Sequence, residues 1–234
     1  MMIGDFGKHS SYGLLAWLGM LAVHAGCGSS QEDSLETLVR QVRSGTSDRI
    51  VVPEFLVQDD DLALLADLPR LVHLSIQESQ ITDKGLRHLA GLQNLEHLHL
   101  RGAEIGDTGI EHLLGLEKLR NLNLPQSQLT DAGMKRLTKL PSLELLRIGS
   151  PHLTNDSLQS VALMPGLRFL HLIDVPITDP GLDHLAGLTQ LESLYLDGTR
   201  ISDAGIEKLM QLLPKVHLHL NQQHPDNHPA DHTH

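Results

Sequence analysis

Leucine and isoleucine return at a fixed interval along most of this chain, from Leu68 to Leu220. The clearest repeat, Leu92 to Gly115, reads LQNLEHLHLRGAEIGDTGIEHLLG. Its first half alternates polar and apolar residues, as in His97-Leu98-His99-Leu100. Alternation of this kind places the two leucines on one face of an extended strand and the two histidines on the other. The first half of each repeat is therefore predicted to be a strand.

The second half of each repeat has a different period. Residues 81 to 89, ITDKGLRHL, supply a capping Thr or Asp followed by apolar residues three apart. This spacing predicts a short helix behind the strand. The same pair recurs as Thr130-Asp131, Thr178-Asp179 and Ser202-Asp203. Metal ligation by these hydroxyls and carboxylates is the alternative, but a helix start is the more common use of such pairs.

A fixed period of this length indicates a solenoid, in which each unit buries its apolar face only by stacking on its neighbours. We expect one continuous sheet of eight parallel strands, each three to five residues long, near residues 50, 74, 98, 122, 146, 170, 194 and 218. Residues 34–45 are predicted to form a capping helix. Residues 46–221 are predicted to form the repeat domain, with residues 46–67 as a divergent first repeat.

The run LxxLxxLxLxxxxITDxGLxxL resembles the leucine-rich repeat family over about two thirds of the chain. With its ITDxGL half it is closer to the cysteine-containing subtype of F-box adaptors, although the cysteines of that subtype are missing, and similar arrays occur in bacterial surface proteins. The resemblance implies a curved, right-handed α/β solenoid with a parallel sheet on the concave face and short helices on the convex side. Many family members carry Asn after the strand, where this chain has Ser79, Ala103, Ser127, Pro151, Val175 and Thr199.

Residues 1–26 are predicted to be an export signal of the bacterial lipoprotein type. Lys8 and His9 precede the apolar run from Leu14 to Val23, which is too short to span a bilayer comfortably. The following Ala25-Gly26-Cys27 resembles a lipoprotein processing site, with Cys27 as the lipidated residue and residues 27–33 as a short linker. Plain secretion is the alternative, since His24 stands where an apolar residue is usual. We therefore expect an exported protein that is lipid-anchored in the cell envelope, or, under the alternative, one that is periplasmic or secreted.

Composition narrows the function classes. The formal net charge is -11, without the Lys and Arg clusters that nucleic acid requires. Common catalytic and phosphate-binding motifs do not occur, so we expect neither an enzyme nor a cofactor. Cys27 is the only cysteine, so an intramolecular disulfide is impossible.

Residues 222–234 are rich in His and contain Pro225 and Pro229, and they are predicted to be disordered.

The concave face is the predicted binding surface for a protein or peptide. Neighbouring strands bring outward residues into columns, and seven spacings of about 4.8 Å with a width of about 15 Å give on the order of 500 Å². That area is closer to a protein footprint than to a small-molecule pocket. The predicted partner-binding residues are Asn121, Asn123, Arg147, Phe169, His171 and Tyr195. Arg147, Phe169, His171 and Tyr195 are the expected anchor, because Arg and aromatic residues dominate interface energies.

Metal binding is the competing hypothesis. His73, His97 and His99 fall close together at one end of the same face, and neutral imidazole is a common metal ligand. Solvated strand histidines without that role are the simpler interpretation. The histidines of residues 222–234 offer a second possible metal site, which the two prolines hinder by preventing a helix. The alternative function is therefore that of a His-rich metal-binding envelope protein.

Overall fold

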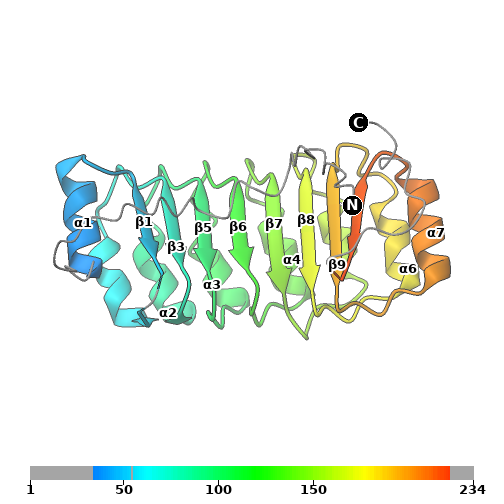
Figure 1. Ribbon diagram of the computed structural model, residues 1–234, viewed down its shortest axis with the longest axis horizontal. Helices are drawn as coiled ribbons and strands as arrows, with labels where there is room; N and C mark the ends of the chain where they lie inside the picture. Colours follow the sequence, from blue (N-terminus) through cyan, green and yellow to red (C-terminus); the bar gives the residue numbers. More distant parts are fainter. Residues whose placement is uncertain (1–33, 54, 222–234) are drawn as a thin grey trace, which may run out of the picture. The chain divides into compact units, whose positions relative to one another are not determined.

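The computed structural model describes residues 34–53 and 55–221. Eight parallel strands form one sheet in the order β1-β3-β5-β6-β7-β8-β9-β10, with the helices behind it (Figure 1). The strands are β1 (Arg49–Val52), β3 (His73–Ile76), β5 (His97–Leu100), β6 (Asn121–Leu124), β7 (Leu145–Gly149), β8 (Phe169–Ile173), β9 (Ser193–Asp197) and β10 (His217–Leu220). This confirms the predicted parallel sheet and the short strands. The predicted signal, the lipidation residue Cys27, the whole linker and the tail lie outside the described residues.

The strands pair in a constant register. Leu74 lies opposite Leu98, and Leu98 lies opposite Leu122. Each strand residue therefore pairs with the residue at the same position of the next repeat. The repeat length of the sequence thus sets the register of the sheet. A two-stranded sheet of β2 (Val57–Gln58) and β4 (Ser79–Gln80), which the sequence pattern did not predict, joins the first two repeats.

The core is a continuous stack of leucine and isoleucine between the sheet and the helices. In β5, Leu98 and Leu100 are fully buried, and the leucines at the corresponding places of β6 and β8 are too. Full burial of one such side chain contributes about 1.5–3 kcal/mol before entropy is counted. Folding is therefore driven from the inner side of each strand, which leaves the outer side available for other uses.

The helices on the other side of the sheet are short. They are α1 (Leu35–Ser44), α2 (Asp83–Leu86), α3 (Asp107–Glu111), α4 (Asp131–Leu137), α5 (Ser157–Val161), α6 (Asp179–Leu182) and α7 (Asp203–Leu212), with 3₁₀ helices η1 (Asp59–Leu65), η2 (Arg87–Leu89) and η3 (Asp183–Leu185). In α1, the Ser34 hydroxyl accepts a hydrogen bond from the Thr37 amide. Leu35, Val39 and Val42 of α1 are buried against the first repeat.

At most helix starts an acidic residue forms hydrogen bonds with the next repeat, in addition to the capping role that the sequence predicts for the Thr beside it. The Thr130 hydroxyl accepts from the Ala132 amide and caps α4. Asp107 of the preceding repeat accepts hydrogen bonds from the Thr130 amide at 2.9 Å and from its hydroxyl at 2.7 Å. Asp59, Asp131 and Asp179 accept the corresponding bonds from the Thr or Ser one repeat further on. Asn155 accepts from the Thr178 amide and donates to the Thr178 hydroxyl.

This ladder of carboxylates explains the glycine of the ITDxGL motif. A Cβ on Gly133 would collide with the Asp107 carboxylate and with Leu129. Glycine is retained there because the next repeat must approach the acidic residue closely. In the repeat that contains β7, Ser157 replaces this glycine, and its hydroxyl donates to the Thr154 carbonyl at 2.7 Å. There α5 begins later in its repeat than α4, with Asp156 as its N-cap.

Candidate protein-binding face

The outer side of the sheet gathers the predicted binding residues into two columns. One column consists of His73, His97, Asn121, Leu145, Phe169, Ser193 and His217. The other consists of Ser75, His99, Asn123, Arg147, His171, Tyr195 and His219. We call this surface the sheet face. Its larger side chains are mostly half-buried by one another, so the backbone and the neighbouring side chains hold them in place.

A chain of hydrogen bonds crosses four strands at the centre of the sheet face. Arg147 donates from Nη1 to the Asn123 side-chain oxygen at 3.2 Å and from Nε to His171 Nδ1 at 3.1 Å. His171 Nδ1 therefore accepts, and its Nε2 lies 2.8 Å from the Asp197 carboxylate. The proton of a neutral His171 consequently sits on Nε2. This chain of hydrogen bonds fixes the orientation of the guanidinium.

The charged groups of this chain lie in a partly dry environment. Burial lowers the pKa of Arg147, and the nearby Asp197 opposes that shift. Burial also lowers the pKa of His171, although its hydrogen bond to Asp197 raises it. The result is a positively charged arginine beside a neutral imidazole. Asp197, which was not among the predicted site residues, belongs to this cluster because it lies two residues beyond Tyr195 on the same strand face.

Aromatic rings continue the sheet face from this centre. Tyr195 stacks on His219, with ring centroids 4.0 Å apart and planes within 6° of parallel. On its other side the Tyr195 ring lies 5.0 Å from that of His171. Phe169 is held at the face by Arg168, whose guanidinium lies 5.5 Å from the ring centroid. Arg168 in turn pairs with Glu192. Arg147, His171 and Tyr195 thus form one connected group that extends to His219, and Phe169 stands outward two residues before His171 on β8.

The predicted metal residues lie near one another but do not assemble a metal centre. The rings of His73 and His97 are 5.4 Å apart and tilted by 40°. His99 Nδ1 faces the Ser75 hydroxyl at 3.4 Å. Within residues 34–53 and 55–221, no group of three His, Cys, Asp or Glu side chains is placed to hold a metal ion. Burial is the main reason that the pKa of His73 and that of His99 fall to about 4.

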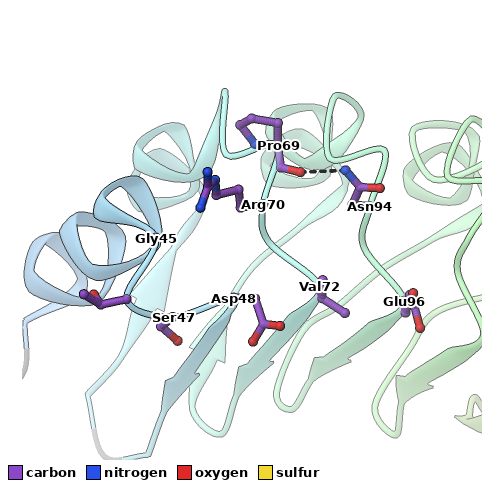
Figure 2. Close-up of a pocket in the computed structure, with 9 residues that line it drawn as sticks. Gly45, Ser47, Asp48, Pro69, Arg70, Val72, Asn94 and Glu96 are labelled. Carbon is purple, nitrogen blue, oxygen red and sulfur yellow. Dashed lines mark hydrogen bonds between the residues drawn. The ribbon is translucent and has the colours of Figure 1, made fainter.

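Two cavities lie at the strand ends, away from the centre of the sheet face. One, of about 600 Å³, lies where strands β1, β3 and β5 begin, beside the end of α1, and includes Asp48, Arg70 and Glu96 (Figure 2). The Asn94 amide donates to the Pro69 carbonyl at its edge. The other, of about 680 Å³, is lined in part by Leu56, by Arg101 and by the side-chain amides of Gln77, Gln80 and Gln126. Neither cavity contains a predicted binding residue.

Comparison with known proteins agrees with this architecture. A model of the leucine rich repeat matches residues 91–114 and 187–210. The array is a leucine-rich repeat solenoid. Internalin C2 from Listeria monocytogenes has a similar structure, with a TM-score of 0.56 and 22% sequence identity, over 83% of this chain and 88% of that one. No curated protein matches the chain.

The helices of the leucine-rich repeat array were compared with the length and hydrophobicity that a membrane-spanning helix requires. Among the residues that the structure describes, none of the helices has the length and apolar character needed to cross a bilayer. The anchor predicted from the sequence is a lipid on Cys27, and that residue lies outside the described part.

Proposed function

We propose that this leucine-rich repeat protein is a non-enzymatic binding module of the bacterial cell envelope, which captures a protein or peptide on its sheet face. The observation that carries the proposal is the connected group of Arg147, His171 and Tyr195, with Phe169 standing outward on the same strand as His171. These side chains stand outward on adjacent strands while the leucines between them form the core. Residues of these types, held rigidly at the centre of a surface, supply most of the energy in protein interfaces.

The shape of the surface supports a macromolecular partner. The sheet face is an open row of strands, and the two cavities described above lie at its edges rather than at its centre. Small ligands are usually enclosed by a pocket, whereas a protein footprint is broad and shallow. Attachment to a membrane through Cys27 would hold this surface at the cell envelope, which agrees with a protein that recruits or tethers a partner.

Capture from an envelope extract tests the proposal. The double variant Phe169→Ala, Tyr195→Ala should lose captured protein, with a cost of more than about 1 kcal/mol for each truncation. Both side chains lie outside the core, so the variant should keep its circular dichroism spectrum and thermal midpoint. Leu163→Ala is the matched control, because Leu163 is 65% exposed on the helix side.

Equal capture by the double variant and the wild type would place binding on another surface. Repeating the capture experiment with a chelator distinguishes the metal-binding hypothesis from capture on the sheet face. Capture through the sheet face should be unaffected by the chelator, since none of the described interactions of the anchor group uses a metal. Capture that disappears with chelator and survives the double variant would favour the metal-binding alternative.

A further inference from the structure

The Arg147 guanidinium retains unused binding capacity. An arginine side chain has five N–H groups. Arg147 donates one to Asn123 and one to His171, which leaves three. Within the described residues no carboxylate oxygen lies within 4.0 Å of this guanidinium, whereas Arg120 and Arg168 near the same face each pair with a glutamate. Arg147 is thus an oriented, half-buried cation whose direct partners are neutral.

A second cation stands near Arg147. Arg101 stands exposed at the end of β5 and interacts repulsively with Arg147. The one acidic group of the central chain, Asp197, contacts His171 rather than Arg147. The attraction of Asp197 for Arg147 exceeds the repulsion from Arg101, but the carboxylate makes no direct contact with the guanidinium. An anionic group placed over Arg147 would relieve both the repulsion and the cost of partial burial.

Apolar side chains flank this cation. Leu145 stands two residues before Arg147 on β7 and pairs with Phe169 on β8. Both side chains are half-buried and turned outward. On the other side of His171 stands Tyr195, whose ring contacts that of the histidine. A ligand that reaches Arg147 with a negative group therefore has an apolar strip beside it.

From this arrangement we infer that the sheet face recognises a peptide segment in which an aspartate or glutamate stands next to an apolar residue. The carboxylate pairs with the free N–H groups of Arg147, and the apolar side chain packs on Leu145 and Phe169. Asn123 and the His171–Asp197 pair act as positioning residues for the guanidinium. The inference rests on the proposed function and specifies the chemistry of its partner.

A random 12-residue peptide library displayed on phage, selected on the full-length protein at low salt, provides the test. Recovered sequences should be enriched in Asp or Glu beside an apolar residue. One recovered peptide is then synthesised with its acidic residue and, separately, with the matching amide. The wild type should bind the acidic peptide at least tenfold more tightly than the amide peptide.

Arg147→Met keeps much of the side-chain stem and removes the charge, so it should abolish this preference. Lys135→Met removes a positive charge from the exposed side of α4 and should leave the preference intact. Peptides that depend on Phe169 and Tyr195 but show no acidic preference would overturn the inference and leave the proposed function standing. Failure to recover peptides, or recovery of peptides indifferent to all three side chains, would overturn the inference, whereas the proposed function is decided by capture with the Phe169→Ala, Tyr195→Ala variant.

Discussion

Replacing His99 by Asn should remove part of the protein's sensitivity to acid. The His99 residue is 9% exposed, and burial, followed by the charges of Arg147 and Arg101, lowers its pKa from 6.5 to about 4. At pH values between the two pKa values, His99 binds a proton in the unfolded chain but not in the folded chain. The free energy of unfolding therefore falls as the pH falls through this range. Asn123 occupies the same column on the next strand, so the sheet already accommodates Asn in this environment.

The expected magnitude follows from that shift. Between about pH 7.5 and about pH 4.5, a depression of this size lowers the free energy of unfolding by about 2–3 kcal/mol for the one group, at about 1.36 kcal/mol per pKa unit. The pKa of His73 is also lowered to about 4, but its side chain is only partly buried, so solvent screening makes its contribution smaller. The wild type should therefore lose more stability on acidification than His99→Asn does.

Urea unfolding at the two pH values measures this directly. The difference in unfolding free energy between them should be smaller in His99→Asn than in the wild type by about 2–3 kcal/mol. His112→Asn serves as the control, because His112 is exposed on the helix side and keeps its contact with solvent on folding. If His99→Asn and the wild type lose the same stability on acidification, His99 is not the buried neutral imidazole that the structure indicates.

Three further predictions concern the array and its anchor. Asp107→Ala should lower the free energy of unfolding by about 1–2 kcal/mol because the Thr130 amide and hydroxyl lose their acceptor, whereas Asp107→Asn should change it little, since an Asn already fills this place two repeats later; equal losses in chemical denaturation would contradict this. Gly133→Ala should lower it by about 1–3 kcal/mol through collision with Asp107, while Gly115→Ala, with open space around its Cβ, should be nearly neutral in the same assay. Cys27→Ser should move the protein from the membrane fraction to the soluble fraction, and an unchanged distribution on immunoblots would place the anchor elsewhere.

The parts of the fold that could be predicted are those that depend on period and alternation. The spacing of Leu74, Leu98 and Leu122 gives both the strand positions and their register, because a one-residue slip would expose every leucine of a strand. The helix starts follow from the Thr and Asp pairs. The small sheet of β2 and β4 was not foreseen, since two-residue strands are too short to carry an alternating pattern.

The candidate site was predictable in location but not in its contacts. Alternation alone places Arg147 and His171 on the outer face of neighbouring strands. Their hydrogen bond, and the link from His171 to Asp197, depend on rotamers that the pattern of residues does not specify. The second role of Asp107 was missed for a similar reason, because a helix cap is a local signal and a bond to the next repeat spans 23 residues.

The constant register has a consequence for the length of the array. Strand partners such as Leu74 and Leu98 lie one repeat apart, and side-chain hydrogen bonds between repeats join residues separated by 21 to 26 positions. Duplication or loss of one whole unit would leave every other unit with neighbours of the same kind, whereas insertion of a single residue within a strand would turn its leucines toward solvent. A duplication between β5 and β7 would lengthen the array by one strand spacing, about 4.8 Å, and carry the His73 end away from Arg147. The distance between these two groups can therefore change in whole steps during evolution while the packing of each repeat stays the same.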